Sequence, residues 1–254
     1  MTNKKIRVVF IGCVDSSRAA LGALLTEDSV EVVCLVTRSS SKFNADFNDL
    51  TDLIKQGEGQ ILYIDKGWSE NDLNIVEKLC PDFIFCVGWS FLLPKQLVEL
   101  PNKATIGYHP ASLPLNRGRH PIIWALVLGL TQTASSFFVI DEGVDNGPIV
   151  HQIKIPITQE DNALSLYQKL LDVIPFQIHE IVKKFQGGGL QLEKQDEASV
   201  NYWRKRVPDD GIIDWRMSAT GIHNLIRALS RPYSGAEFKF KQKLIKVWSS
   251  KVIE

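Results

Sequence analysis

The sequence predicts an α/β protein with a mainly parallel sheet, followed by a small C-terminal α+β segment. In the first half of the chain, short β-branched runs alternate with segments whose apolar residues recur at helical spacing. Such alternation implies right-handed crossovers and a sheet covered by helices on both faces. A second observation is the breaker Gly187-Gly-Gly189, after which the chain becomes charged and its elements become short. We therefore expect two domains, 1–190 and 191–254, the second so short that it is either C-terminally truncated or a minimal appendage.

The elements of the first half follow in order from these patterns. Strands are expected where β-branched and aromatic residues cluster, at residues 6–12, 30–37, 61–64, 83–87 and 104–108. Helices are expected where apolar residues recur every three or four positions, at residues 17–25, 50–55 and 71–79. Pro81 ends the last of these helices, and the polar residues 38–48 form a loop.

The second half is predicted in the same way. Strands are expected at residues 137–140, 149–155, 236–240 and 244–248. Helices are expected at residues 118–128, 163–185 and 220–229. Pro121 is tolerated in the first turn of a helix, whereas Pro175 should kink the long one. The charged residues 193–198 are expected to form a linker.

Composition limits the class of protein. The chain has 254 residues, and its 29 basic and 29 acidic side chains cancel to a formal net charge of zero. This balance argues against sequence-independent nucleic-acid binding, which requires a basic surface. No apolar run approaches the roughly 20 residues that span a bilayer, and the one after the N-terminal lysines is too short for a signal peptide. We expect a cytoplasmic protein that buries about 70% of its surface.

The cysteines predict neither a disulfide framework nor a metal site. Cys13, Cys34, Cys80 and Cys86 form no CxxC pair and are scattered through apolar surroundings. We expect reduced, buried thiols and no zinc.

The first expected strand leads into Gly12-Cys-Val-Asp-Ser-Ser-Arg18. This turn is neither a GxGxxG nor a Walker loop, so NAD binding is not indicated. A turn from a strand into a helix still presents N–H groups, and Ser16, Ser17 and Arg18 add hydroxyls and a guanidinium, which suits an anionic ligand such as a nucleotide phosphate. The alternative is an ordinary helix cap with a solvated arginine.

A histidine and an aspartate are the strongest candidates for chemistry. His109 follows the strand 104–108, where open α/β sheets place ligands, and Pro110 turns the chain there. Asp145 lies in a turn rich in Asp and Gly between two expected strands. A carboxylate beside an imidazole raises the pKa of the imidazole and fixes its tautomer, as proton transfer near neutral pH requires. The structural alternatives are a packing histidine and an Asx-turn aspartate.

Two motif blocks carry a family resemblance. His109-Pro-Ala-Ser-Leu-Pro114 with Arg117-Gly118, Pro121 and Trp124, followed by Gly143-Val-Asp-Asn-Gly-Pro-Ile-Val150, resembles the 10-formyltetrahydrofolate-dependent formyltransferase family. The tail, Tyr202-Trp-Arg-Lys-Arg206 with Asp209–Trp215 and Ile226–Tyr233, is similar to the branch that acts on nucleotide-linked amino sugars. The resemblance runs from the first strand to the strand expected at 236–240 and implies a Rossmann-like catalytic core.

By this resemblance, His109 matches the catalytic histidine and Asp145 the catalytic aspartate of an enzyme that formylates primary amines. The family has an asparagine two residues before the histidine, but this chain has Gly107. Loss of an oxyanion donor can cost about 10²–10³ in rate. Three explanations stay open: another donor such as protonated His109 or a water, a subfamily built this way, or an inactive chain. We expect activity, because the histidine and the aspartate are both present.

The resemblance also implies the ligand contacts. The folate co-substrate, 10-formyltetrahydrofolate, should be held by residues 86–91, by the turn that carries Asp145 and by the neighbouring turn: Gly88, Trp89, Ser90, Leu113, Arg117, Ile140, Asp141, Glu142, Gly143 and Asp145. Gly88 allows close backbone approach, and Trp89 offers an aromatic face, with core packing as its alternative role. Arg117 has a structural ion pair as its alternative role. The amino substrate is assigned to Gly12, Ser16, Ser17, Arg18 and Tyr108.

We therefore expect formyl transfer to the amine of a nucleotide-linked sugar, without a metal, by a protein that needs no membrane or nucleic-acid partner. A homodimer is one option for its assembly. The alternatives are methionyl-tRNA formyltransferase, formyltetrahydrofolate hydrolase, and a catalytically silent protein that binds folate or a nucleotide sugar. Methionyl-tRNA formylation should require a fuller, more basic C-terminal domain.

Overall fold

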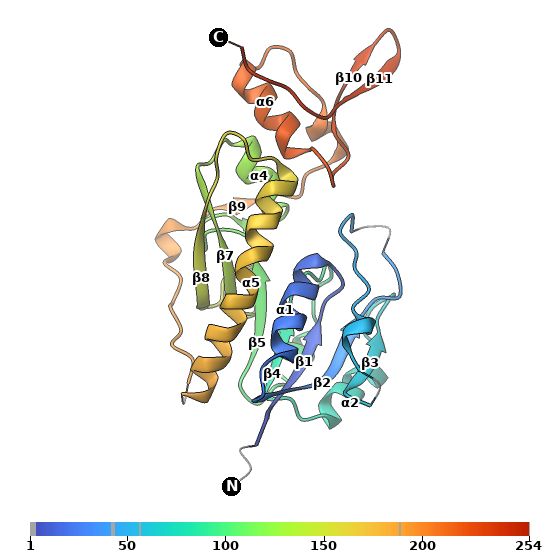
Figure 1. The fold of residues 1–254 in the computed structure, drawn as a ribbon, viewed down its shortest axis with the longest axis vertical. Coiled ribbons are helices and arrows are strands. Elements are labelled where there is room, and N and C mark those ends of the chain that lie inside the picture. Colours follow the sequence, from blue (N-terminus) through green and yellow to red (C-terminus); the bar gives the residue numbers. More distant parts are fainter. Residues whose placement is uncertain (1–3, 42–43, 56, 188, 254) are drawn as a thin grey trace. The chain divides into compact units, whose positions relative to one another are not determined.

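A seven-stranded sheet with the strand order β3-β2-β1-β4-β5-β7-β8 runs through the computed structural model of the chain (Figure 1). The structure describes residues 4–41, 44–55, 57–187 and 189–253. The pairs β1–β2, β2–β3, β1–β4 and β4–β5 are parallel, which confirms the expected α/β class. The strands are β1 (Ile6–Ile11), β2 (Val30–Thr37), β3 (Gln60–Tyr63), β4 (Phe83–Cys86), β5 (Ala104–His109), β7 (Gln132–Val139) and β8 (Ile149–Pro156).

The chain divides into two compact units that alternate along the sequence. The first unit contains Met1–Tyr108, Ser136–Gln152 and Val173–Gln195, and the second contains His109–Ser135, Ile153–Asp172 and Asp196–Glu254. Strands β5, β7 and β8 and helix α5 (Ala163–Gln186) each pass from one unit to the other. The boundary expected between residues 190 and 191 stays a prediction.

In the first unit, both faces of the sheet are covered by helices. Successive strand residues point to opposite sides, so neighbouring residues of β4 contact different layers. On one face, Phe83 of β4 stacks on Phe185 of α5 with ring centroids 3.8 Å apart. On the other face, a buried cluster joins β1 and β4 to α2 (Glu70–Lys78) and α3 (Lys95–Val98), and includes Val9, Ile84, Val76 and Leu97.

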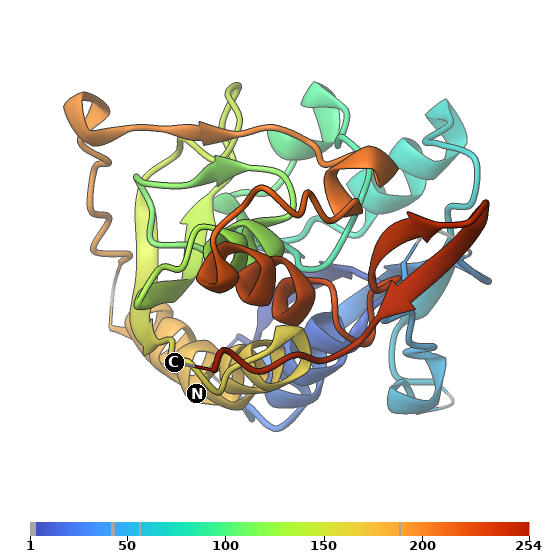
Figure 2. The same ribbon diagram turned by 90° about the horizontal axis from the view of Figure 1, so that it is seen from above.

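The second unit contains helices α4 (Pro121–Val127) and α6 (Ala219–Ala228), which pack on each other. The antiparallel hairpin of β10 (Ala236–Phe240) and β11 (Lys243–Val247) follows, and the chain then returns alongside α6 (Figure 2). There Nδ1 of His223 lies 3.0 Å from Oγ of Ser250.

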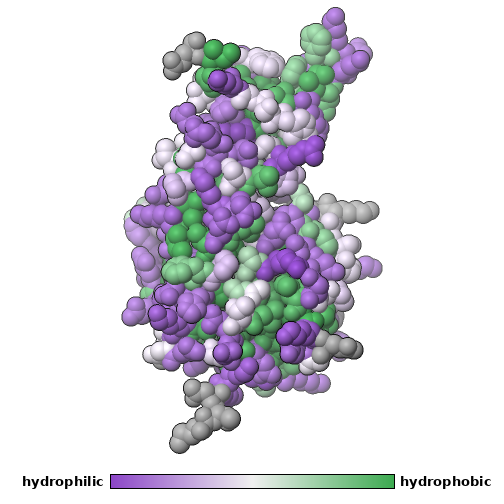
Figure 3. Space-filling view, in the orientation of Figure 1, coloured by the Kyte–Doolittle hydropathy of each residue, from purple (hydrophilic) through white to green (hydrophobic). Residues whose placement is uncertain are grey.

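Phe240 and Leu244 are exposed on the hairpin, so hydrophobic and hydrophilic surfaces adjoin there (Figure 3). A short parallel pair, β6 (Arg117–Gly118) with β9 (Tyr202–Trp203), completes the unit.

Most elements agree with the sequence prediction, and the differences have local causes. The helix expected from residue 118 begins at Pro121, because Arg117 and Gly118 form β6. Helix α5 continues through Pro175 although proline removes one backbone hydrogen bond. Its apolar stripe is fully buried, which stabilises the helix on either side of the proline, at Leu166, Leu170, Ile174, Ile178 and Ile181.

The cysteines differ in exposure. Cys13 and Cys34 are buried as expected, whereas the expectation is wrong for Cys80, which is exposed. Burial raises the pKa of Cys13 to about 11 and the pKa values of Cys34 and Cys86 to about 12. No helix among the described residues combines the length and hydrophobicity needed to cross a bilayer. The same residues contain no cluster of three His, Cys, Asp or Glu side chains arranged to hold a metal ion.

The loop after β4 packs closely against the start of helix α1 (Asp15–Leu25), and this packing can be tested by substitution. Gly88 has φ +65°, and a Cβ there would lie 2.1 Å from Cγ2 of Val14. We expect Gly88→Ala to lower the free energy of unfolding by about 2 kcal/mol or more, through backbone strain and overpacking. Gly22→Ala is the matched control: a Cβ there meets nothing within 4 Å, and alanine should stabilise the helix by about 0.5–1 kcal/mol. Urea unfolding of both variants measures the difference, and equal effects would contradict the prediction.

Candidate functional site

The predicted site residues belong to both compact units, and each unit is described by itself. In the first unit they lie on loops that follow parallel strands. The carboxyl ends of parallel strands share one edge of a sheet, which is where α/β proteins bind ligands. The loops in question follow β1 and β4, and a third connects β7 to β8.

The turn between β1 and α1 is held together by Ser17. Its hydroxyl donates to the carbonyl oxygen of Val87 at 2.6 Å and accepts the amides of Cys13 and Val14, each at 3.0 Å. A hydroxyl has one proton and two lone pairs, so these contacts use its full capacity. Gly12 is required by the same packing, because a Cβ there would lie 2.4 Å from the Val87 oxygen. The hydroxyl of Ser17 therefore fastens β1 to the end of β4, and the expected contact with a phosphate is not supported.

Arg18 is also engaged within the unit. Its guanidinium makes two bonds to the carboxylate of Asp52, at 2.8 and 2.6 Å, and a third to Asn48. The arginine lowers the pKa of Asp52 through this hydrogen-bonded pair. An anionic ligand would have to displace Asp52 to use the same cation. Ser16 is buried, and its Oγ would lie 3.0 Å from a Cβ at Gly88.

The loop after β4 combines packed and exposed residues. Trp89 packs against the buried cluster beneath the sheet, which supports its structural role. Its ring nitrogen is nevertheless buried without a hydrogen-bond partner among the described residues. Ser90 is held by Asn44, whose Nδ2 lies 3.1 Å from the Ser90 hydroxyl. Phe91 and Leu92 then project outward, 49% and 93% exposed.

The loop between β7 and β8 carries Asp145. This residue has a left-handed backbone, with φ +52°, and is half-buried. The carbonyl oxygens of Asp145 and Gly147 both accept from Nε2 of Gln195, at 2.8 and 2.6 Å. Gln195 is itself buried. It lies in the stretch 193–198 that the sequence assigned to a linker, so that expectation is wrong at this residue.

An ion pair connects α3, the helix that follows the β4 loop, to the loop that carries Asp145. Nζ of Lys95 lies 2.5 Å from Oε1 of Glu142, and this contact raises the pKa of the lysine. Both groups are exposed, so the pair adds little stability. It does establish that the segment following the β4 loop lies beside the loop that carries Asp145. Within that loop, Asp141 accepts the amide of Glu142 in a local turn.

A side chain at Gly107, such as the family's asparagine, would require its neighbours to shift. A Cβ at this position would lie 2.9 Å from Cγ1 of Ile140 and 3.0 Å from Cζ of Phe138. Ile140 is held there by its amide, which donates to the carbonyl oxygen of Thr105 on β5. Two apolar side chains thus crowd the space above Gly107 and favour glycine there. Tyr108, the next residue, places its ring 5.0 Å from that of Phe137.

In the second unit, His109 is buried and its ring orientation is fixed. The exposed fraction of the residue is 6%, and Nε2 lies 2.9 Å from the carbonyl oxygen of Asn116. Asn116 has a left-handed backbone with φ +67°. Its amide donates to Oδ1 of Asn201 at 2.6 Å. The imidazole is therefore held by a turn that is itself held by a residue far along the chain.

Arg117 is a buried ion-pair residue of the same unit. Its side chain is 1% exposed and reaches the carboxylate of Glu197 at 2.8 Å and the hydroxyl of Tyr202 at 3.0 Å. Burial by itself would lower the pKa of Arg117, but the hydrogen bonds that it donates to Glu197 and Tyr202, with the charge of Glu197, together raise it. These contacts support its structural role over direct folate contact. Leu113, four residues earlier, is buried.

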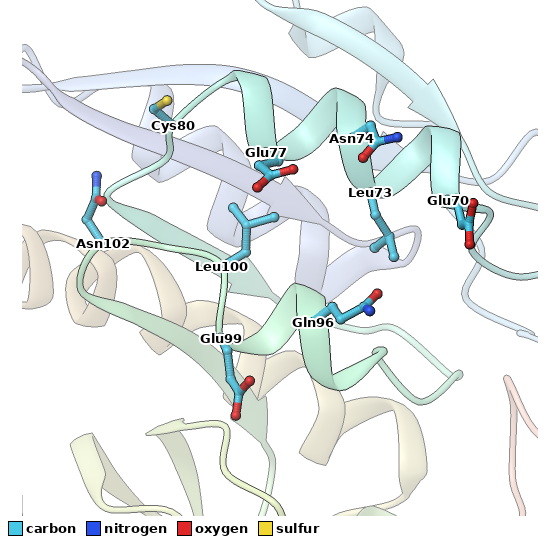
Figure 4. Close-up of a pocket in the computed structure, with 9 residues that line it drawn as sticks. All are labelled: Glu70, Leu73, Asn74, Glu77, Cys80, Gln96, Glu99, Leu100 and Asn102. Carbon is cyan, nitrogen blue, oxygen red and sulfur yellow. The ribbon is translucent and has the colours of Figure 1, made fainter.

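A separate groove of about 660 Å³ lies between α2 and α3 of the first unit (Figure 4). Leu73 and Leu100 give it an apolar lining, and the carboxylates of Glu70, Glu77 and Glu99 surround them. The exposed thiol of Cys80 lies at one end (Figure 4). None of the predicted site residues lines this groove.

Sequence reasoning missed three residues that hold the candidate site. Gln195, Asn116 and Asn201 act through contacts with backbone groups, at separations of up to 85 residues. An amide side chain in a polar stretch has no distinguishing pattern, because solvated and buried glutamines or asparagines look the same in a sequence. A weak signal existed for Asn116, since asparagine is enriched in left-handed turns.

Comparison with known proteins identifies the relatives of this fold. The sequence model of the family described as formyl transferase matches residues 4–180, and that of the formyl transferase C-terminal domain matches residues 205–254. A 4-N formyltransferase from Francisella tularensis is 18% identical with a TM-score of 0.75, over 97% of this chain and 99% of its own. An N-formyltransferase from Helicobacter canadensis was solved with folinic acid and dTDP-3-aminofucose. It is 17% identical with a TM-score of 0.72, and the match covers 96% of this chain and 86% of that protein. A methionyl-tRNA formyltransferase from Clostridium thermocellum is 16% identical with a TM-score of 0.68, and the match covers 98% of this chain and 94% of that protein.

The packing above Gly107 can be tested by restoring the family's residue. Gly107→Asn should lower the free energy of unfolding by about 1–3 kcal/mol, because its Cβ overpacks against Ile140. In an Ile140→Ala background the same substitution should cost measurably less, because the nearest atom is gone. A double-mutant cycle in urea measures the coupling. Strict additivity of the two substitutions would show that the space is not shared.

The four thiols should differ in reactivity. At pH 8 the folded protein should react with iodoacetamide first at Cys80, because burial raises the pKa values of Cys13, Cys34 and Cys86 and leaves little thiolate there. Peptide mass spectrometry after timed labelling gives the order. Cys80→Ser should remove the fast phase, and equally fast labelling of Cys86 would refute the assignment.

Proposed function

The chain belongs to the formyl transferase family, and we propose that it transfers a formyl group from 10-formyltetrahydrofolate to the primary amine of a nucleotide-linked amino sugar. The observation that carries the proposal is His109, a buried histidine at the end of β5 whose Nε2 is held by a backbone carbonyl. A histidine oriented through one ring nitrogen is suited to exchange a proton at the other.

The proposed reaction requires the protein to transfer protons and to stabilise charge. The amine nitrogen forms a bond to the formyl carbon, and the bond from that carbon to the folate nitrogen breaks. His109 takes the proton that the amine loses, and the folate nitrogen takes up a proton as it leaves. By the resemblance of its motif block, Asp145 is proposed as the carboxylate that supports this proton transfer, as carboxylates do for catalytic histidines. The half-buried position and fixed backbone of Asp145 suit this role.

The first unit has features that suit a reduced pterin. The loop after β4 and the loop that carries Asp145 expose the apolar side chains of Phe91, Leu92 and Val144. Oδ1 of Asn146 is buried without a hydrogen-bond partner among the described residues. Apolar contacts with a few unsatisfied polar atoms are typical of sites that a heteroaromatic ligand completes. When bound, the folate supplies the activated formyl group, and Gly88, Trp89 and the residues 140–145 would hold it.

Two observations support an amino-sugar acceptor: the motifs of the tail and the similarity of the fold to solved N-formyltransferases. The Helicobacter canadensis enzyme was solved with an amino sugar linked to a nucleotide, and the Francisella tularensis enzyme is a 4-N formyltransferase. The acceptor of this chain is therefore proposed as a class, an amine on a nucleotide-linked sugar.

A charge asymmetry favours a second candidate, methionyl-tRNA formylation. Residues 205–254 contain ten basic and five acidic side chains, so this segment is positive although the whole chain is neutral. Basic surfaces attract the phosphates of RNA. The fold is also similar to that of the Clostridium thermocellum methionyl-tRNA formyltransferase. An assay must therefore include both classes of acceptor.

The purified chain should formylate a nucleotide-linked amino sugar when 10-formyltetrahydrofolate is supplied. Mass spectrometry of a panel of such sugars would detect the added formyl group, and methionyl-tRNA would form the second arm of the same experiment. Product with methionyl-tRNA alone would replace the sugar proposal by the second candidate. Free formate without any acceptor product would indicate a hydrolase. Folate binding without any reaction would indicate a silent binding protein.

The roles of the two residues are tested by variants. His109→Ala and Asp145→Asn should each lower kcat by about 10²–10⁴, because each removes a group needed for proton transfer. His223→Ala and Asp172→Asn are matched controls outside the candidate site and should retain activity. Steady-state kinetics with 10-formyltetrahydrofolate measure the loss. Near-normal turnover in either site variant would show that the role assignment is wrong.

A further inference from the structure

We propose that Arg119, His120 and Arg206 form a binding site for the diphosphate group of a nucleotide. The three residues lie in the second compact unit, where the segment after β9 approaches the residues that precede α4. A free nucleotide and a nucleotide-linked sugar both carry a diphosphate, and only the second source rests on the proposed function.

Arg206 is a buried cation without an ion-pair partner in the part of the chain that the structure describes. The residue is 9% exposed, and its guanidinium lies 4.6 Å from the ring centroid of Trp124. Nη2 donates to the main-chain oxygen of Asp210 at 2.5 Å. The guanidinium has five N–H donors, and Nε and Nη1 have no partner among the described residues and are not sealed from solvent. A buried charge is costly unless it is paired, so an anion would complete this site.

The carboxylate of Asp210 does not supply that anion. It accepts two hydrogen bonds from Arg204, at 2.7 and 2.5 Å, and a third from the amide of Val207 at 2.7 Å. The hydrogen-bonded pair with Arg204 holds the pKa of Asp210 well below its usual range. The negative charge of Asp210 is therefore neutralised by Arg204, and Arg206 contacts only the main-chain oxygen.

His120 places a second donor beside Arg206. The amide of Arg206 donates to Nδ1 of His120 at 3.3 Å. Burial lowers the pKa of His120, and the charges of Arg119, Arg206 and Lys205 lower it further, so the ring is neutral near pH 7. In a neutral imidazole whose Nδ1 accepts, Nε2 carries the proton. This N–H has no acceptor among the described residues.

Arg119 adds an exposed guanidinium. Its amide donates to the main-chain oxygen of Trp203 at 3.0 Å, which fixes its backbone beside β9. Within the described ranges, its side chain has neither an ion pair nor a hydrogen bond. Like charges that lie near one another repel, so an anion bound among them is stabilised.

These donors suit a diphosphate. Guanidinium groups bind phosphate oxygens through paired hydrogen bonds, and two guanidinium groups match two linked phosphates. The recessed position of Arg206 favours a small ligand, because sequence-independent binding of RNA uses an exposed basic surface. We therefore assign the site to a nucleotide and not to an RNA backbone.

Binding is measured by isothermal titration calorimetry of the full chain with thymidine diphosphate, uridine diphosphate and inorganic pyrophosphate. All three should bind, because they share the diphosphate. Arg119→Ala and His120→Ala should each weaken binding about three- to tenfold, and Arg206→Met about tenfold or more, because each removes hydrogen bonds to a charged ligand. Thermal unfolding checks that the variants are folded. Arg119→Ala removes an exposed side chain, so it tests the site even if Arg206→Met does not fold.

Arg216→Ala is the matched control. It removes an exposed arginine of the same unit that pairs with Asp214, outside the proposed site. Its dissociation constants for the three probes should equal those of the unsubstituted chain.

Steady-state kinetics separate the two sources of the diphosphate. If the nucleotide-linked sugar is the ligand, Arg119→Ala should raise its KM by the factor measured for the dissociation constant, at nearly constant kcat. Free diphosphates should then compete with the sugar. If a free nucleotide is the ligand, the KM for the sugar should not change in this variant.

Failure of all three probes to bind at millimolar concentration would overturn the proposal. So would equal affinities of Arg119→Ala, Arg206→Met and the unsubstituted chain. Binding of a single-stranded RNA oligonucleotide without binding of the diphosphates would assign the cations to RNA instead. The titrations need no reaction: if the probes bind as expected but no acceptor is formylated, the site stands and the proposed function fails. Formylation of a sugar by a chain whose affinities the variants do not change would show the reverse.

Discussion

The hydrogen bond from His109 to the carbonyl oxygen of Asn116 is the interaction on which the candidate chemistry depends. It selects one tautomer of a buried imidazole and fixes the direction of its ring. The turn that supplies the carbonyl is short and has a left-handed residue, so distant parts of the chain must hold it. The geometry of one histidine therefore depends on a turn whose residue Asn116 is bonded to a residue 85 positions further along the chain.

The loops of the first unit are organised by the same principle. Buried backbone groups need hydrogen-bond partners, and side chains supply them where strands and helices cannot. Ser17 satisfies amides and a carbonyl between β1 and β4, and Gln195 satisfies two carbonyls of the loop that carries Asp145. Residues of the types that bind ligands are here used to hold the loops that a ligand would contact.

Gly107 has a consequence for the reaction. Phe138 and Ile140 fill the space where the family's asparagine would project, so this position offers an apolar wall and no amide donor. Charge that develops on the formyl oxygen must be stabilised by other groups, for which a protonated imidazole of His109 is suited. The glycine at position 107 is thus matched to the side chains of Phe138 and Ile140, and restoring the asparagine alone would disturb their packing.

The sequence by itself determined the α/β class, nearly all strands and helices, and the two motif blocks with His109 and Asp145, because these follow from local periodicity and from residue types at fixed spacing. It did not show the internal partners of residues with ligand-binding groups: Ser17 contacts Val87, Arg18 pairs with Asp52, and Arg117 pairs with Glu197. It also assigned Gln195 to a linker and gave Asn201 no role. Only the tertiary structure decided these points, because a hydrogen bond between residues far apart in the chain depends on where folding brings their backbones.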